Sequence, residues 1–210
     1  MKKIICLAAI MVVILTAIFV SYSTIYDNNV TPKQNEEQVQ IQKVEPVKID
    51  VATKEEIEIR YLKQCAKEYP TATKIWKYMR YELDWSPEVC AGVMGNLMAE
   101  CGGQTLQIDP YAKSPGYYGI CQWSSEYYPD VIGTDLDYQL KFLKGTVESE
   151  FNTYGYLYGG SGFGYKSFKQ IERPEDAALA FAECYERCSS KTYYIREENS
   201  LKAYSYFTNY

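Results

Sequence analysis

The stretch that decides the fold is residues 86–103, which read S-P-E-V-C-A-G-V-M-G-N-L-M-A-E-C-G-G. Ser86 is a good helix cap, Pro87 fits the first turn, and Glu88 favours the positive end of the helix dipole. Apolar side chains follow at helical spacing, and a glycine pair then stops the helix. The sequence therefore predicts a buried helix that ends at Cys101.

Glu100 holds an unusual position at the carboxyl end of this helix. The negative end of the helix dipole and the apolar surroundings both disfavour a charged carboxylate, so we expect Glu100 to keep a proton near neutral pH. A glycosidase needs such a neutral acid to protonate the oxygen that links two sugars. The local pattern alone also fits a solvated glutamate at a frayed helix end.

Helical patterns on both sides indicate one domain over residues 54–210, in the α+β class and mostly α. Thr53 and Glu56 form a capping box for the first helix, and Thr71 or Thr73 is expected to cap the next. A Gly-, Pro- and Tyr-rich segment, 104–129, indicates loops or a small β-hairpin. The glycines of 154–164 indicate a mobile surface loop. The remaining helices are expected over residues 54–68, 134–147, 174–187 and 194–207.

Composition excludes several classes of protein. The 210 residues are 47% hydrophobic and 23% charged, which permits a packed core. The net charge of −5 argues against nucleic acid as a partner. The absence of histidine excludes Ser-His-Asp hydrolases, Cys-His peptidases and His-ligated metal sites.

The N-terminus predicts export. Lys2 and Lys3 precede an apolar run over residues 4–20, which as a helix spans about 25 Å against a hydrocarbon core of about 30 Å. We expect a signal anchor or a signal peptide within residues 1–26, with the rest of the chain outside the cytoplasm. The protein is then a single-pass membrane protein with an extracellular C-terminal domain, or a secreted one if the signal is cleaved. The polar residues 27–53 indicate a flexible extracellular stalk.

Six cysteines lie outside the apolar run, an even number that permits three disulfides in an oxidising compartment. Sequence leaves their pairing open, and free buried thiols remain the alternative. With no histidine to activate a thiolate, a nucleophilic role is disfavoured. The six are Cys65, Cys90, Cys101, Cys121, Cys184 and Cys188.

Residues 91–102, A-G-V-M-G-N-L-M-A-E-C-G, resemble the signature helix of the phage-tail lysozyme family. Residues 116–124, G-Y-Y-G-I-C-Q-W-S, are similar to its G-Y-G-L-A-Q-W segment. Residues 135–143 and 181–187 resemble its D-L-x-x-Q-L-x-F-L and F-x-x-x-Y-E-R motifs, so the resemblance covers about residues 70–207. Such domains are similar to lysozymes and lytic transglycosylases, with helices and a small β part beside a cleft.

The resemblance implies a peptidoglycan-cleaving enzyme without a cofactor. The bond is the β-1,4 linkage between N-acetylmuramic acid and N-acetylglucosamine, and Glu100 is the general acid. The aligned segment implies sugar contacts from Tyr118 and Gln122. Trp123 and Tyr117 are candidates for stacking on sugar rings, with core packing as the alternative for both. Cysteines replace small family residues on both sides of the implied cleft, so one expectation is a disulfide that pins its walls, between Cys101 and Cys121.

A second carboxylate decides between two chemistries. A hydrolase needs one to activate water or to attack the sugar, whereas a lytic transglycosylase needs only the first acid. Asp109 is the leading candidate, with Asp130 and Asp135 as alternatives; an Asx turn competes as the role of Asp109. Glu186 matches a family position, and also fits a structural ion pair with Arg173 or Arg187.

Three functions therefore compete. The first is a membrane-tethered muramidase that acts on peptidoglycan glycan strands, for example to open the wall for a secretion or conjugation assembly. The second is an inactive lysozyme-like module that binds glycan or anchors an assembly. The third is a tyrosine-rich adhesion protein, since the chain has 22 tyrosines.

Overall fold

The computed structural model describes residues 52–210, and these belong to one compact unit. The expected membrane segment and nearly all of the expected stalk lie outside the described residues. Within residues 52–210, every helix is too short or too polar to cross a bilayer.

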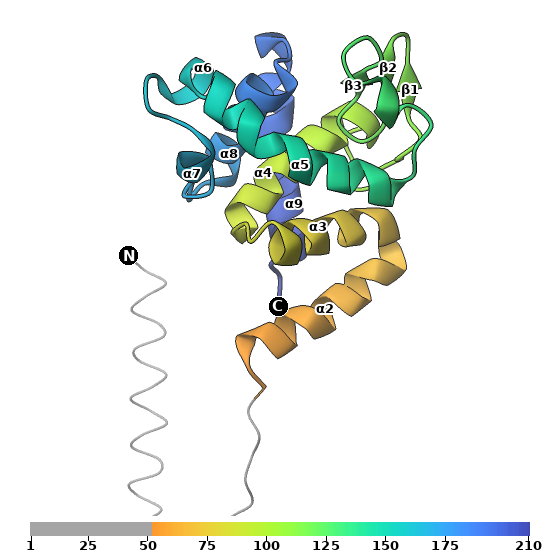
Figure 1. The fold of residues 1–210 in the computed structure, drawn as a ribbon. Helices are drawn as coiled ribbons and strands as arrows, with labels where there is room; N and C mark the ends of the chain where they lie inside the picture. Colours follow the sequence, from red (N-terminus) through yellow and green to blue (C-terminus); the bar gives the residue numbers. More distant parts are fainter. Residues whose placement is uncertain (1–51) are drawn as a thin grey trace, which may run out of the picture. The chain divides into compact units, whose positions relative to one another are not determined.

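The unit is mostly helical and carries one small antiparallel sheet (Figure 1). The predicted α+β, mostly α class is therefore confirmed. The sheet has the order β1-β2-β3, and Tyr118 pairs with Trp123 across its last two strands. The elements are α2 (Lys54–Glu68), α3 (Pro70–Glu82), α4 (Pro87–Cys101), β1 (Lys113–Ser114), β2 (Tyr117–Tyr118), β3 (Trp123–Ser124), η1 (Pro129–Val131), α5 (Leu136–Tyr154), α6 (Tyr156–Gly159), α7 (Tyr165–Phe168), α8 (Pro174–Phe181), η2 (Ala182–Glu186), η3 (Ser190–Thr192) and α9 (Tyr193–Phe207).

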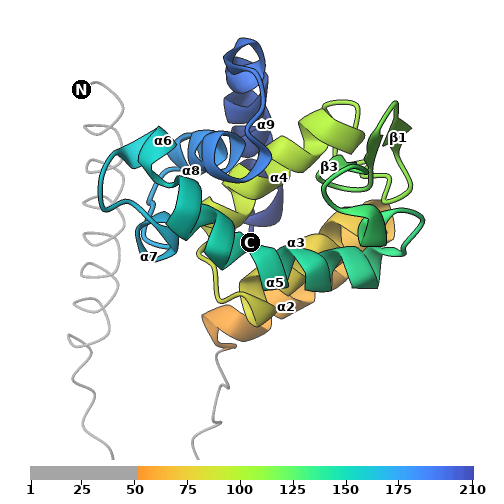
Figure 2. The ribbon, with the colours of Figure 1, turned by 45° about the horizontal axis from the view of Figure 1, so that its top comes forward.

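Helix α4 packs against α3, α8 and α9, and the small sheet lies beside its carboxyl end (Figures 1 and 2). Its predicted ends are confirmed, because Ser86 Oγ accepts a hydrogen bond from the Val89 amide at 3.2 Å and Gly102 is the C-cap. A Cβ atom at Gly92 would lie 2.5 Å from the Cβ of Ala177 on α8. At Gly95 a Cβ would overlap backbone atoms of α9. The two glycines therefore let α8 and α9 approach α4 directly.

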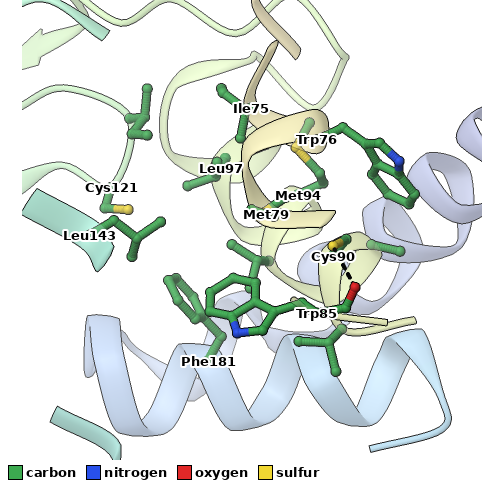
Figure 3. Packing of buried hydrophobic residues seen from close by; sticks show 14 of the residues in the cluster. Ile75, Trp76, Met79, Trp85, Cys90, Met94, Leu97, Cys121, Leu143 and Phe181 are labelled. Atoms are coloured by element: carbon green, nitrogen blue, oxygen red, sulfur yellow. Dashed lines mark hydrogen bonds between the residues drawn. The ribbon is translucent and has the colours of Figure 1, made fainter. Parts of the chain in front are cut away.

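Large apolar side chains fill the space around α4 (Figure 3). Met94 and Leu97 of α4 and Phe181 of α8 are fully buried. Trp76 stacks on Phe207 with ring centroids 4.4 Å apart, which ties α3 to α9. Each such side chain stabilises the fold by about 1.5–3 kcal/mol on burial. The core thus fixes the position of α4, the helix that carries Glu100.

A buried glutamine ties the sheet segment to α5. Gln139 Oε1 accepts a hydrogen bond from the Ile120 amide at 2.9 Å, and its Nε2 donates to the Pro110 oxygen at 2.8 Å and the Thr134 oxygen at 3.0 Å. The Asp109 amide also donates to the last residue of α4, at 3.3 Å. These bonds hold the small sheet against the end of α4.

Some local expectations are confirmed and others corrected. The capping box of Thr53 and Glu56 is present. Thr71 and Thr73 do not cap α3, because the helix already begins at Pro70, whose ring suits the first turn. The segment 154–164, expected to be loop, contains the short helix α6, and the helix expected to reach residue 187 turns into the π-helical η2.

Candidate active site

Glu100 lies in the last turn of α4 with 21% of its side chain exposed. Arg196 of α9 donates a hydrogen bond from Nη2 to Glu100 Oε1. Its Nη1 donates to Glu186 Oε2 at 2.6 Å and to Asn96 Oδ1 at 2.9 Å. One guanidinium therefore joins two carboxyl groups from distant parts of the chain. We call Glu100, Arg196 and Glu186 the carboxyl cluster.

Neighbouring helices hold Arg196 in place. The Asn96 amide nitrogen donates to the Gly92 oxygen at 3.0 Å and to the Ala178 oxygen at 2.9 Å, which leaves its own oxygen directed at Arg196. The Arg196 side chain is only 4% exposed. Burial lowers the pKa of Arg196, but the carboxylates of Glu186 and Glu100 outweigh this and raise it. Arg196 therefore remains charged.

Glu186 is the most enclosed member of the cluster. Its side chain is 3% exposed, and its Oε1 has no hydrogen-bond partner among the described residues. Burial raises the pKa of Glu186, the Arg196 charge opposes this rise, and the charge of Glu100 adds to it. An unpaired buried acceptor costs about 1–3 kcal/mol, so this oxygen is a place for a proton or a donor.

A hollow of about 420 Å³ opens beside Glu186. Two exposed aromatic side chains line it, Tyr117 at 51% and Tyr127 at 73% exposure. Aromatic faces beside polar groups suit a sugar, which presents both C–H faces and hydroxyl groups. The other lining residues are Cys121, Gln122, Trp123, Ser124, Glu126, Tyr128, Tyr185, Glu186 and Arg187.

The expected sugar contacts differ in their burial and in their hydrogen bonds. Tyr118 is 2% exposed and its hydroxyl donates to the Thr134 oxygen at 3.1 Å, so the expectation that it contacts sugar is corrected to a role in the core. Trp123 is 5% exposed and donates to the Tyr185 hydroxyl at 3.1 Å, although it also lines the hollow. Tyr117 instead lines the hollow with an exposed side chain.

Gln122 lines the hollow but uses its side-chain amide within the sheet. Nε2 donates to the Ala112 oxygen at 3.1 Å and the Gly119 oxygen at 2.9 Å, while Oε1 accepts from Ser114 Oγ at 2.8 Å. Its backbone has a φ of 46°, a strained conformation for a residue other than glycine. Gln122 thus shapes this wall of the hollow.

The expected disulfide between Cys101 and Cys121 is absent, because all six cysteines in residues 52–210 are free thiols. Cys101 Sγ lies 3.3 Å from the Leu97 oxygen and 3.5 Å from the Ile120 oxygen, so it is directed at backbone acceptors. Burial raises the pKa of both thiols. They are neutral packing groups between α4 and the sheet segment.

The three aspartates proposed as second carboxylates have other places in the structure. Asp109 is exposed and its Oδ1 accepts from the Tyr111 amide at 2.9 Å, which is the competing Asx turn. Asp135 caps α5, and Asp130 is exposed in η1. The carboxyl group that the structure brings to Glu100 is that of Glu186.

The expected ion-pair partners of Glu186 were also wrong. Arg173 pairs with Glu175 at 3.1 Å and Arg187 pairs with Glu150 at 2.5 Å. Sequence reasoning missed Arg196 altogether, because no local pattern links it to a residue about a hundred positions earlier. It also missed Tyr127, whose only signal is its place in a Tyr-rich segment.

Across the part of the chain that the structure describes, no group of three Cys, Asp or Glu side chains could hold a metal ion. The sequence profile of the phage tail lysozyme family matches residues 70–207. Neither a curated protein nor a solved structure matches the chain significantly.

Proposed function

Because this chain belongs to the phage tail lysozyme family, we propose that its site cleaves the glycan strands of peptidoglycan with Glu100 as the general acid. One observation carries the proposal: Glu100 lies in the last turn of the central helix of the matched region and keeps 21% of its side chain exposed. It is linked through Arg196 to Glu186, which borders the aromatic hollow. The bond that fits this assignment is the β-1,4 linkage between N-acetylmuramic acid and N-acetylglucosamine.

In the proposed mechanism the Glu100 carboxyl group acts first as an acid and then as a base. Neutral Glu100 donates its proton to the bridging oxygen as the bond from C1 to that oxygen breaks, which leaves positive charge on the sugar ring. The 6-hydroxyl of the same sugar then bonds to C1 and returns a proton to the Glu100 carboxylate. If water bonds to C1 instead, a second carboxylate is required to activate the water or to hold the sugar. Water gives a reducing end, and the 6-hydroxyl gives a 1,6-anhydro end.

The proposal extends to where the enzyme works. The apolar run 4–20 behind Lys2 and Lys3 supports a membrane anchor or a cleaved signal, and the polar residues 27–53 support an extracellular stalk. A tethered enzyme of this kind opens the wall locally, as a secretion or conjugation assembly requires. Protease treatment of intact cells should release the C-terminal domain from the membrane fraction.

One observation favours a second candidate function. The Arg196 guanidinium donates to Glu100, and a cation at this position stabilises a carboxylate rather than the neutral acid that protonates a leaving group. An inactive lysozyme-like module that binds glycan fits such a pair. The two functions make opposite predictions for the products formed from peptidoglycan.

Mass spectrometry of fragments released from purified peptidoglycan by the full chain distinguishes them. The matched variants are Glu100→Gln and Glu88→Gln, which remove carboxylates at opposite ends of α4; Glu88 only accepts a hydrogen bond from Tyr204 at 2.8 Å. We expect fragments from the unmodified protein and from Glu88→Gln, and none from Glu100→Gln. Binding without fragments in all three proteins supports the inactive module. Equal release by all three contradicts the assignment of Glu100.

A further inference from the structure

We propose that a second hollow, at the amino end of α4, binds a phosphate monoester group. This basic hollow has a volume of about 480 Å³ and is lined by three cationic side chains, those of Arg80 on α3, Lys166 on α7 and Lys169 just after α7. Among the described residues that line it, Asp84 alone carries a carboxylate. The whole chain has a net charge of −5, so an excess of positive charge around one hollow runs against the general composition.

The basic hollow is separate from the hollow beside Glu186. Ser86, the N-cap of α4, lines the basic hollow, whereas Glu100 lies in the last turn of the same helix. The helix has 15 residues, so at a rise of about 1.5 Å per residue its two ends lie about 22 Å apart. A ligand in the basic hollow therefore leaves the proposed cleavage site free, and this inference does not rest on the proposed function.

Core contacts fix the two walls of the basic hollow relative to each other. Trp85, between α3 and α4, is fully buried, and its Nε1 donates to the Tyr165 hydroxyl of α7 at 2.9 Å (Figure 3). The ring of Phe168, also on α7, meets the Trp85 ring edge to face with centroids 5.5 Å apart. These contacts hold α7 beside the connection from α3 to α4. The site is therefore formed before a ligand arrives, which lowers the entropic cost of binding.

Arg80 is anchored at the base of this arrangement, with 21% of its side chain exposed. Its Nε donates to Glu58 Oε1 at 3.1 Å, and its Nη1 donates to the Trp85 oxygen at 2.5 Å. Glu58 balances part of the positive charge. Even with Glu58 included, three cations face two carboxylates, so the surroundings of the hollow remain positive.

The two lysines supply the accessible charge. Lys166 is exposed, and Lys169 Nζ forms an ion pair with Asp84 Oδ2 at 3.2 Å. The Asp84 side chain is 97% exposed, and such exposed pairs contribute little to stability, so an incoming anion can displace it. A phosphate monoester carries about −1.5 to −2 charges at pH 7 and three strong acceptor oxygens. It can therefore accept from both lysines and from the Ser86 hydroxyl, which a singly charged carboxylate does less well.

The test is amine labelling of the full chain, followed lysine by lysine with mass spectrometry. Sodium phosphate is added at constant ionic strength, with sodium chloride as the reference. We expect phosphate to slow the labelling of Lys166 and Lys169 several-fold and to reach saturation. Labelling of Lys74, which is 51% exposed and does not line the hollow, should not change. Equal slowing at Lys74, or no saturable slowing at all, overturns the proposal.

Two substitutions should change the affinity for phosphate in opposite directions. Lys169→Gln removes a cation, so protection of Lys166 should need about tenfold more phosphate. Asp84→Asn removes the competing carboxylate and should lower the phosphate needed; asparagine also tolerates the left-handed backbone at this position, where φ is 54°. The matched control is Lys144→Gln, because Lys144 forms an exposed pair with Glu82 at 3.3 Å away from the hollow.

Opposite changes in the two variants, with none in the control, support the proposal once circular dichroism shows that all three proteins are folded. Equal affinity in all three, or a change of the same sign in Lys169→Gln and Asp84→Asn, overturns it. None of these measurements involves turnover. The result therefore stands whether or not Glu100 cleaves a glycan.

The same labelling distinguishes the sources of the phosphate group. The full chain is tested with soluble glycerol 3-phosphate, and separately with vesicles of phosphatidylcholine alone or mixed with phosphatidic acid. Protection of Lys166 that requires phosphatidic acid supports a lipid headgroup as the ligand. Protection by glycerol 3-phosphate without any effect of the vesicles supports a soluble phosphate monoester. Protection by neither overturns the phosphate site.

Discussion

The carboxyl cluster and the sheet segment 113–128 are neighbouring parts of one site that are built very differently. In the cluster, helices far apart in sequence meet closely, and the side chains of Arg196 and Glu186 are at most 4% exposed. In the sheet segment the strands have two residues each, and Tyr117 and Tyr127 are more than half exposed. Under the proposed function, the comparison places proton chemistry on closely packed helices and contact with the glycan on an exposed rim.

The largest expected effect comes from separating α4 and α9. In Gly95→Ala the new Cβ overlaps backbone atoms of Arg196 and Ser200, and backbone cannot move aside as a flexible side chain does. We expect a loss of about 1–3 kcal/mol in the free energy of unfolding, measured by urea denaturation. Cleavage should fall as well, because Arg196 shifts with α9.

Gly145→Ala on α5 is the matched control, since a Cβ there meets nothing within 4 Å. In an open helical position alanine should be neutral or stabilise by about 0.5–1 kcal/mol. Equal stability losses in both variants would contradict the close packing of α9 on α4.

The second prediction uses the pH dependence of stability. Burial raises the pKa of Glu186 above the ordinary 4.5 of the unfolded chain. At a pH between the unfolded and the native pKa, Glu186 therefore holds a proton in the native state that the unfolded chain releases. The unmodified protein should therefore lose stability as pH rises above about 4.5, by up to about 1.4 kcal/mol per pH unit. Glu186→Gln lacks this decline. If the free energy of unfolding changes with pH in the same way for the two proteins from pH 4 to 7, Glu186 does not hold a buried proton.

A third prediction concerns the rim. Tyr117→Ala removes an exposed ring from the hollow, so KM for peptidoglycan should rise about tenfold while the unfolding free energy stays within about 0.5 kcal/mol. Tyr138→Ala on α5 removes a comparably exposed ring, 43% exposed, that does not line the hollow, and KM should not change. If both variants bind glycan alike, the hollow is not the sugar site.

The smallest effect should come from the tyrosine next in sequence. Tyr118→Phe removes the hydroxyl that donates to the Thr134 oxygen at 3.1 Å, which should cost about 0.5–1.5 kcal/mol of stability. Cleavage should be unchanged, because the ring belongs to the core. A KM that rises as strongly as in Tyr117→Ala would restore Tyr118 as a sugar contact.

The sequence predicted what local chemistry determines. The ends of α4 follow from Ser86, Pro87 and Gly102, and the position of Glu100 follows from where that helix stops. Arg196 could not be predicted, because its pairing depends on two glycines that bring distant helices together. Tyr117 and Tyr118 look alike in sequence. Because successive side chains of a strand point to opposite faces, only Tyr118 of β2 reaches the core. The absence of a Cys101–Cys121 disulfide could not be predicted either, because the contact of the Cys101 thiol with the Ile120 oxygen depends on how α4 packs against the sheet segment.

The central claim is that Glu100 meets the bridging oxygen of a glycan, and a complex tests it most directly. A crystal structure of the Glu100→Gln variant with a peptidoglycan glycan fragment would show the position of that oxygen without turnover. We expect it within hydrogen-bond distance of the side chain at position 100, with a sugar ring against Tyr117. A glycan bound elsewhere, with that side chain still held by Arg196 and no sugar oxygen near it, would contradict the account.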